Sequence, residues 1–170
     1  MELWDIVDEH GTSTGRTHIV GTPMRDGEYH PSVSVWLMRG DGRMLISRRA
    51  QTDHAAGMWE TTSGSILAGE TAADAALREV REELGIALDP AFGRRWIAYT
   101  WPHSTCPGGA YIEVWIFRCE AEVDALILQP EETSEAAWAT PDDIRARIRA
   151  GEFIPYDYIE RLFAEIEESK

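Results

Sequence analysis

The first half of the chain alternates hydrophobic and polar residues in short runs typical of β-strands. Residues 3–7 and 16–20 flank a polar turn that contains glycine, so we expect a small N-terminal hairpin. Residues 21–31 are interrupted by glycine and proline and are expected to form a connector. Residues 32–38 and 43–49 flank a Gly-Asp-Gly turn, which is the strongest hairpin signal in the sequence.

The second half mixes strand-like runs with runs of helical period. Strands are expected at residues 58–62, 94–101, 110–119, 126–128 and 136–139, and helices at residues 141–150 and 156–168. Proline in the first turn supports the first of these helices, and one apolar side supports the second. Because periods of two and 3.6 are interleaved, the pattern predicts an α/β protein with a mixed β-sheet.

One further helix is predicted within residues 64–86, GSILAGETAADAALREVREELGI. Thr71, followed three residues later by Asp74, is a near match to a capping box and would begin the helix. Gly85 followed by Ile86 is typical of a left-handed C-terminal cap. The apolar stripe that would face the core consists of Ala73, Ala76, Leu77, Val80 and Leu84.

The other side of this helix carries three glutamates, Glu79, Glu82 and Glu83. At about 100° of rotation per residue, Glu83 lies roughly 40° from Glu79 around the helix axis, and Glu82 lies about 60° from Glu79 in the opposite direction. Like charges at this spacing repel one another and weaken a helix, and a bound divalent cation would offset this repulsion. Carboxylate oxygens are ligands that suit Mg²⁺ or Mn²⁺. Arg78, with Asp74 and Glu82 four residues to either side, would hold one carboxylate. The alternative is an acidic face that is simply solvated.

The glutamates belong to a longer pattern, G-x5-E-x7-R-E-U-x-E-E-x-G-U, in which U is aliphatic. It is the signature of the Nudix hydrolase family, which the chain resembles at every fixed position. The residues that fill it are Gly64, Glu70, Arg78, Glu79, Val80, Glu82, Glu83, Gly85 and Ile86. So many fixed positions in so short a stretch make chance a poor explanation.

The resemblance implies a Nudix-type α/β/α sandwich in which the motif helix packs on the mixed sheet. We expect a single domain over residues 1–170, with the hairpin and connector in residues 1–31 and the core in residues 32–170. The implied reaction is attack of water on one phosphorus of a diphosphate linkage, X–P–P–Y, in a nucleoside-diphosphate-type or other organic diphosphate. Divalent ions both neutralise the phosphate oxygens and activate the water in such reactions.

The resemblance also implies roles for individual residues. Glu79, Glu82 and Glu83 would hold the ions, joined in most family members by a backbone carbonyl, here that of Ser63. Arg78 would orient the site, and Glu70 would support the loop before the helix or act as an outer ligand, rather than bind the ions directly. In some members a glutamate on a later loop activates the water, and the candidates for this general base are Glu131, Glu132 and Glu135, with Glu132 favoured. Solvated loop carboxylates, a motif glutamate as the base, or the metal alone remain alternatives.

Composition narrows the range of partners and locations. A chain of 170 residues suffices for one well-buried core, and a formal charge of −14 argues against nucleic acid or an anionic membrane as the partner. A small anionic substrate stays compatible, because bound metal reverses the local sign of charge. Two cysteines form no disulfide framework, and neither a signal peptide nor a membrane span is apparent. We therefore expect a cytoplasmic enzyme, and the hairpin and exposed strand edges would suit a homodimer.

The second enzyme class considered is isopentenyl diphosphate isomerase, which shares the Nudix fold and resembles this chain in its N-terminal region and around residues 46–50. In that comparison His30 and Glu113 match ligand or catalytic positions. Four other positions differ, with residues that do not suit the isomerase site: Met24, Ser63, Ser65 and Tyr111. Serine cannot act as the thiol acid of that enzyme, so hydrolysis is the favoured reading.

A third reading is a nucleotide-binding module without catalysis, which would be expected to carry a broken motif. The motif in this chain is intact at every fixed position.

Trp101, His103 and Tyr111 flank an expected loop at residues 102–109 and could touch a leaving group, although a packing role is the safer interpretation. The motif identifies the diphosphate and the metals, whereas the groups on either side of the diphosphate are read by loops that vary freely on such scaffolds.

Overall fold

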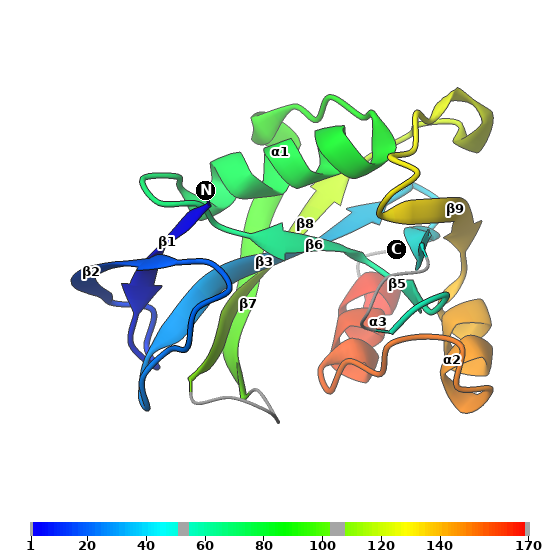
Figure 1. The fold of residues 1–170 in the computed structure, drawn as a ribbon. Coiled ribbons are helices and arrows are strands. Elements are labelled where there is room, and N and C mark those ends of the chain that lie inside the picture. The colour runs from blue at the N-terminus through cyan, green and yellow to red at the C-terminus, as the bar shows by residue number, and fades with distance from the viewer. Residues whose placement is uncertain (1, 51–54, 103–107, 169–170) are drawn as a thin grey trace. The chain divides into compact units, whose positions relative to one another are not determined.

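The computed structural model describes residues 2–50, 55–102 and 108–168 (Figure 1). Within them lie nine strands, three α-helices and two short 3₁₀ turns. The strands are β1 (Leu3–Val7), β2 (Ser13–Ile19), β3 (Tyr29–Met38), β4 (Met44–Arg49), β5 (Trp59–Glu60), β6 (Thr62–Ser65), β7 (Gly93–Pro102), β8 (Gly109–Arg118) and β9 (Thr133–Ala139). The helices are α1 (Ala72–Leu84), α2 (Pro141–Arg149) and α3 (Ile159–Glu168), and the 3₁₀ turns are Pro90–Phe92 and Val123–Ala125.

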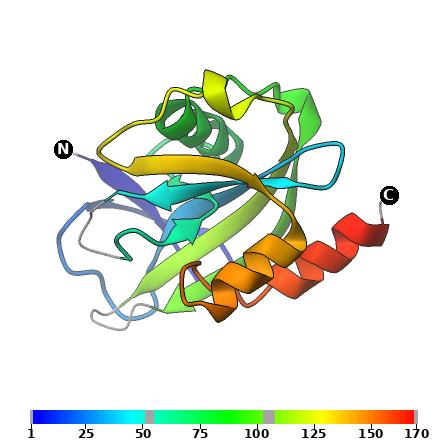
Figure 2. The same ribbon diagram turned by 90° about the vertical axis from the view of Figure 1, so that its right-hand side faces the viewer.

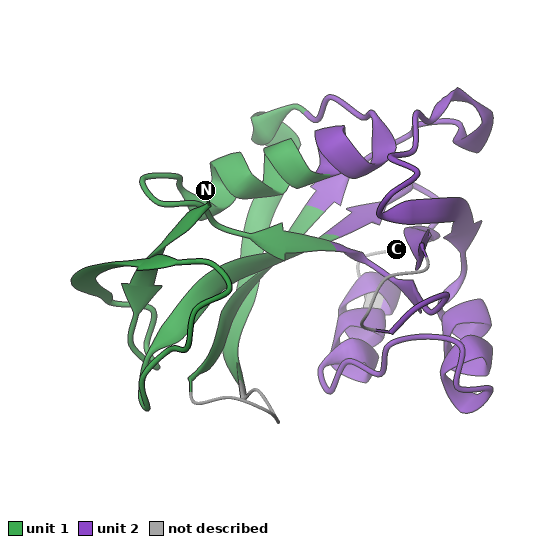
Figure 3. Cartoon of the chain, in the orientation of Figure 1, with its two compact units in different colours: residues 1–35, 63–79, 89–116 green, residues 36–62, 80–88, 117–170 purple. Residues whose placement is uncertain are grey.

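The chain divides into two compact units, which are described separately (Figure 3). The first comprises residues 1–35, 63–79 and 89–116, and the second comprises residues 36–62, 80–88 and 117–170. None of the points at which the chain passes from one unit to the other coincides with residue 31, so a single domain with a boundary there stays a prediction. Each unit combines strands with helical segments, and the predicted α/β class with a mixed sheet is confirmed.

The first unit is organised around the N-terminal part of β3. β1 and β2 form an antiparallel hairpin in which Leu3 lies opposite Ile19, and β1 reaches β3 where Val7 pairs with Tyr29. β6 and β8 also pair with β3, and β7 pairs with β8. The side chains that form its core are almost fully buried: Ile6, Val33, Val35, Ala75, Ala76 and Val114. This apolar burial supplies the main stabilisation of the unit.

The second unit is built on β4, which pairs antiparallel with β5 and β9 and, through Leu37–Leu45 and Met38–Met44, with the end of β3. Figure 2 shows α2 and α3 side by side, and Arg145 of α2 joins Glu160 of α3 at 2.7 Å. The same unit contains an aromatic core of Trp36, Phe153, Tyr156 and Tyr158. The indole N–H of Trp36 donates to the Tyr158 hydroxyl at 3.1 Å, so this buried polar atom is satisfied.

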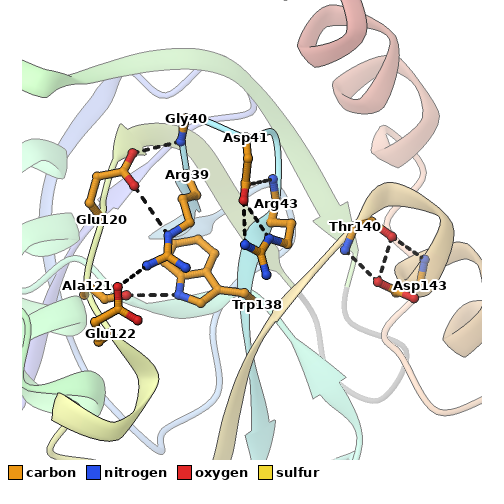
Figure 4. Close-up of polar contacts among 10 residues, drawn as sticks. All are labelled: Arg39, Gly40, Asp41, Arg43, Glu120, Ala121, Glu122, Trp138, Thr140 and Asp143. Atoms are coloured by element: carbon orange, nitrogen blue, oxygen red, sulfur yellow. Dashed lines mark hydrogen bonds and ion pairs between the residues drawn. The ribbon is translucent and has the colours of Figure 1, made fainter.

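A surface cluster in the same unit joins the turn after β3 to the end of β8 (Figure 4). The Arg39 guanidinium lies 5.0 Å from the centroid of the Trp138 ring, and its Nη2 donates to Glu122 at 2.7 Å. The Trp138 indole N–H donates to the carbonyl of Ala121 at 3.0 Å. Figure 4 also shows the capping box of α2, in which Thr140 and Asp143 bond reciprocally.

Most predicted elements are confirmed, including the N-terminal hairpin, the hairpin of β3 and β4, and both C-terminal helices. Five boundaries differ by more than one residue: β2 begins at Ser13, residues 29–31 already belong to β3, residues 58–62 split into β5 and β6, β9 begins at Thr133, and α3 begins at Ile159. The strand predicted at residues 126–128 is wrong. The Ile127 amide in this segment donates to the carbonyl of Leu84 at 3.1 Å. The segment is therefore bonded to the end of α1 and does not pair as a strand.

No helix in the described ranges is both long and apolar enough to cross a lipid bilayer. His103, named above as a residue that could touch a leaving group, and Cys106, one of the two cysteines, lie outside the described residues.

Candidate active site

The motif helix α1 begins and ends where its sequence predicts. Thr71 Oγ1 accepts from the Asp74 amide at 3.1 Å and donates to the Asp74 carboxylate at 2.6 Å, which caps the first turn. At the other end the Gly85 amide donates to the carbonyl of Arg81 at 3.0 Å with a φ of 71°, the left-handed conformation that glycine adopts without strain. A Cβ on Gly85 would also come within 2.8 Å of the Ile127 Cβ.

The three motif glutamates differ sharply in exposure. Glu79 is 9% exposed and Glu83 is 6% exposed, whereas Glu82 is exposed. The sequence predicted an apolar stripe turned away from a charged face, and Val80 and Leu84 are indeed buried. Carboxylates are almost never buried unless they are paired or bind a cation. A face that is merely solvated therefore does not describe Glu79 and Glu83.

Gly64 makes room for the carboxylate of Glu79. A Cβ built on Gly64 would overlap the Oε1, Oε2 and Cδ atoms of Glu79, so no residue with a side chain fits here while Glu79 keeps its position. Gly64 lies on β6, the strand that leads into the loop before the helix. The first glycine of the motif therefore allows a backbone strand to approach the first glutamate of the helix.

Arg78 ties this carboxylate to the preceding loop. It donates to Glu70 through Nε at 2.8 Å and Nη2 at 2.9 Å, to Glu79 through Nη1 at 2.7 Å, and to the carbonyl of Ser65 at 2.9 Å. Helical spacing alone predicts Asp74 and Glu82 as possible partners of Arg78. The structure instead gives it Glu70, eight residues upstream, because the loop folds back beside the helix.

The charges in this network reinforce one another. Hydrogen bonds from Arg78 to Glu70 and then to Glu79 raise the pKa of its guanidinium, so Arg78 stays charged. Burial opposes ionisation of Glu70, but the hydrogen bonds from Arg78 and from the Leu67 amide outweigh it, and the pKa of Glu70 lies below its ordinary value. Glu70 thus supports the loop before α1.

The donor set suits a hard divalent cation. Carboxylate oxygens one helical turn apart, two of the three groups buried, match the ligands that Mg²⁺ prefers. In residues 2–50, 55–102 and 108–168, no three acidic, histidine or cysteine side chains already converge on one point. The donors are of the type that a hard cation prefers, whereas in this conformation the carboxylate of Glu79 is turned toward Arg78.

The loop that carries Glu132 is attached to the end of α1. The Gln129 amide donates to the carbonyl of Glu83 at 3.0 Å, and the Glu132 amide donates to the carbonyl of Gln129 at 3.0 Å. The Glu132 side chain is exposed and accepts a 3.3 Å hydrogen bond from Gln129. Of the other base candidates, Glu131 is exposed in the same loop, and Glu135 lies on β9 opposite Arg48.

The positions compared with the isomerase lie in the first unit. The Nδ1 of His30 lies 3.1 Å from the carbonyl oxygen of Gly109, and its ring stacks on Trp4 with centroids 4.4 Å apart. Glu113 accepts from the Trp115 indole at 3.3 Å and faces Arg95 at 3.4 Å. Tyr111 is buried, as expected for a packing role, whereas Trp101 is exposed.

Glu60 and Arg49 form a buried pair that was not predicted from the sequence. Glu60, on β5, is 7% exposed, and its Oε1 lies 2.7 Å from Nη1 of Arg49 at the end of β4. The sequence gives no signal for this burial, because alternation along a strand would place the residue after a buried Trp59 on the solvent side.

The sequence of the chain is similar to a family model and to several known proteins. The family model for the NUDIX domain matches residues 28–160. A Nudix hydrolase of Listeria monocytogenes is 34% identical over 165 residues, covering 96% of this chain and 94% of that protein. The isopentenyl-diphosphate Delta-isomerase of Streptomyces griseus is 29% identical over 154 residues, covering 85% and 74%.

Structural comparison agrees with this sequence similarity. Among solved structures, the protein DR0079 from Deinococcus radiodurans superposes with a TM-score of 0.71 at 26% identity, covering 98% of both chains. The motif, the family match and the relatives agree over most of the sequence. The chain belongs to the Nudix hydrolase family.

Proposed function

We propose that this protein hydrolyses the diphosphate linkage of a nucleoside-diphosphate-type or other organic diphosphate by attack of water on phosphorus. The observation that carries the proposal is the buried state of Glu79 and Glu83 on a helix whose supporting residues are all in place. Gly64 leaves space for one of these carboxylates, and Arg78 links it to Glu70. Such support is what a site needs in order to hold its ligands in a fixed geometry.

Mg²⁺ is the proposed cofactor, with Mn²⁺ as a substitute, held by Glu79, Glu82 and Glu83 and by the backbone carbonyl of Ser63. When bound, the ion supplies charge neutralisation on the phosphate oxygens and a more acidic water. Arg78 keeps the loop before α1 and the helix together while the carboxylates bind the ion. The exposed Glu82 completes the set from the solvent side of the helix.

Glu132 is the proposed general base, which removes a proton from the attacking water. Its loop is joined by a backbone hydrogen bond to the carbonyl of Glu83, so its main chain is held at the end of the motif helix. A base must come within hydrogen-bond reach of the water when substrate is bound, and exposed side chains such as that of Glu132 can adjust to do so.

The proposed partner is a small-molecule diphosphate rather than nucleic acid or a membrane, in keeping with a net charge of −14. We also place the enzyme in the cytoplasm as one domain and keep the homodimer as a prediction. Substrate classes to be compared are nucleoside triphosphates, nucleotide sugars, ADP-ribose, dinucleoside polyphosphates and prenyl diphosphates.

The test is to incubate the full chain with Mg²⁺ and each of these compounds and to follow the products by phosphorus NMR. Cleavage of one compound into two phosphorylated or phosphate products is expected. The same panel without divalent ions, in excess chelator, is the control. Binding without cleavage of any compound would contradict the proposed reaction and favour a sensing module.

Isomerisation of isopentenyl diphosphate is the second candidate, because similarity to the Streptomyces griseus enzyme covers 85% of the chain. Ser63 and Ser65 weaken it, since serine lacks the acidity of a thiol and does not replace a histidine ligand. The same incubation separates the two activities. An isomerase would form dimethylallyl diphosphate without releasing phosphate.

A further inference from the structure

The loop before α1, residues 66–71, is held by β1 of the N-terminal hairpin (Figure 1). The Ala68 amide donates to the carbonyl of Leu3 at 2.8 Å, and the Gly69 amide donates to Oδ2 of Asp5, also at 2.8 Å. None of these four residues is a fixed position of the motif. The hairpin is therefore attached to the motif region through residues that the motif does not specify.

The carboxylate of Asp5 is oriented by the neighbouring strand. Asp5 lies opposite Thr17 in the register of β1 and β2, and Thr17 Oγ1 donates to Oδ1 of Asp5 at 3.0 Å. Oδ2 accepts from the Gly69 amide. A side chain that a cross-strand partner already holds has less rotamer freedom to lose when it accepts a second bond. The Thr17 bond thus directs the second oxygen of Asp5 toward the loop.

The hairpin is a firm support, because its other end belongs to the core. Ile6, the next residue along β1, is fully buried, and Val7 pairs with Tyr29 of β3. β2 is joined to the connector by Arg16, which donates to the Glu28 carboxylate through Nε at 2.8 Å and through Nη2 at 2.6 Å. Groups on packed, regular elements keep their position more accurately than groups on loops.

Gly69 gives the loop the conformation that Asp5 holds. Its φ is 80°, a left-handed conformation that residues with a side chain rarely adopt. No atom of the described residues lies within 4 Å of a Cβ built at this position, so the backbone conformation, rather than crowding, favours glycine. The next residue is Glu70. The bond from Asp5 therefore fixes the chain directly before the glutamate that binds Arg78.

Printed along the chain, a series of hydrogen bonds continues from this loop to Glu79. Both oxygens of Glu70 accept from Arg78, and Oε2 also accepts from the Leu67 amide at 3.0 Å. Arg78 in turn donates to Glu79 at 2.7 Å. Because both oxygens of Glu70 are engaged, a shift of the loop would move Arg78 and the carboxylate of Glu79 with it. All of these residues belong to the first unit.

Global stability is a poor explanation for the bond between Asp5 and Gly69. Gly69 is exposed and Asp5 is partly exposed. A hydrogen bond at the surface replaces one to water, so it contributes little to the free energy of unfolding. It can still restrict the loop, since local opening needs much less free energy than unfolding of the whole chain. Loss of the Asp5 carboxylate should therefore affect the order of the loop more than the stability of the fold.

We propose that Asp5 is a positioning residue of the active site, which holds the loop before α1 and thereby keeps Arg78 and Glu79 in the arrangement that binds the divalent cation. The proposal rests on the proposed function, because it assigns Asp5 to the same cation site. Removing a residue that orients a metal ligand typically lowers metal affinity by about 10- to 100-fold. Asp5 acts through the loop, so we expect an effect at the lower end of this range.

The test compares Asp5→Ala with Asp5→Asn and with Asp8→Ala. Asp8 is the matched control, because it is an aspartate of the same hairpin whose Oδ1 accepts from the amides of His10 and Thr12 at 2.9 Å, within the turn. Asp5→Asn keeps an acceptor oxygen for the Gly69 amide and should recover most of the loss.

We expect Asp5→Ala to weaken Mg²⁺ binding, measured by calorimetry without substrate, by about tenfold. In the metal-free protein, amide hydrogen exchange of residues 66–71 should become faster. With a substrate of the panel, the Mg²⁺ concentration that gives half of the maximal rate should rise, whereas kcat at saturating Mg²⁺ should change little. Asp8→Ala should match the wild type in all three measurements.

A role limited to folding would lower the urea midpoint and leave Mg²⁺ affinity as in Asp8→Ala, and that result would overturn the proposal. Faster exchange in residues 66–71 with wild-type Mg²⁺ affinity would also contradict it. If Asp5→Ala does not fold, Thr17→Val removes the hydroxyl that orients the carboxylate and should show part of the loss in Mg²⁺ affinity. If no compound of the panel is hydrolysed but Mg²⁺ affinity still falls in Asp5→Ala, the proposed reaction fails and the positioning role of Asp5 stands.

Discussion

The carboxylate of Glu79 occupies the space that a side chain on residue 64 would need. This relationship joins β6 to α1 and gives a physical reason for glycine at the first position of the motif. We expect Gly64→Ala to displace Glu79 and to lower kcat by at least tenfold, with a loss of about 1–3 kcal/mol in the free energy of unfolding from overpacking. Steady-state kinetics and urea unfolding measure both.

Gly40→Ala is the control for this variant. Its Cβ would meet only the end of the flexible, exposed Glu120 side chain, at 3.2 Å. Activity should stay as in the wild type. Wild-type kcat in Gly64→Ala would show that Glu79 does not need its present position for the reaction.

Glu83→Gln tests the metal assignment. The substitution keeps the shape of a nearly buried side chain and removes its charge, so the fold should persist while Mg²⁺ affinity and turnover fall by roughly a hundredfold or more. Circular dichroism reports the fold, calorimetry the Mg²⁺ affinity, and the diphosphate panel the turnover. Glu167→Gln, on the exposed side of α3, is the control that changes net charge equally. Undiminished turnover in Glu83→Gln would count against Glu83 as a ligand.

The parts of the structure that depend on local sequence were predicted well. The start of α1 follows from Thr71 and Asp74, and its end follows from Gly85, because caps involve residues only a few positions apart. The hairpin of β3 and β4 follows from alternation around a glycine turn. The motif glutamates are found on the expected helix for the same reason.

The parts that depend on distant contacts could not be predicted from one sequence. Helical spacing named Asp74 and Glu82 as partners for Arg78, whereas Glu70 binds it because the preceding loop folds back. The Arg49–Glu60 pair depends on how β4 and β5 align, and no periodicity reveals this register.

The pH dependence of stability tests the Arg78–Glu70 pair. Because the folded pKa of Glu70 is depressed below 4.5, its contribution is present above that pH and is lost as the pH falls through the folded pKa. We expect Glu70→Gln to be less stable than the wild type by about 1–3 kcal/mol at pH 7, and the difference to shrink below pH 4.5. Urea unfolding at a series of pH values measures it.

Asp41→Asn is the comparison for this series. The pKa of Asp41 is also lowered, first by the hydrogen bond from the Arg43 side chain, but the pair is solvent-exposed. Solvent screening should make its pH-dependent difference smaller than that of Glu70→Gln. A difference for Glu70→Gln that stays constant from pH 7 to acid would show that ionisation of Glu70 contributes nothing to the loop.

Single glutamine variants of Glu131, Glu132 and Glu135 distinguish the candidates for the general base. Glu135 lies on β9 opposite Arg48, and Glu131 is exposed in the same loop as Glu132. Only the loss of a base removes a proton acceptor needed in the transition state, so Glu132→Gln should lower kcat by about 10²- to 10⁴-fold with little change in KM. Glu131→Gln and Glu135→Gln should keep kcat within a few-fold of the wild type. Equal kcat in all three variants and the wild type would mean that a motif glutamate or the metal deprotonates the water, because no carboxylate of the later loop would then contribute to the rate.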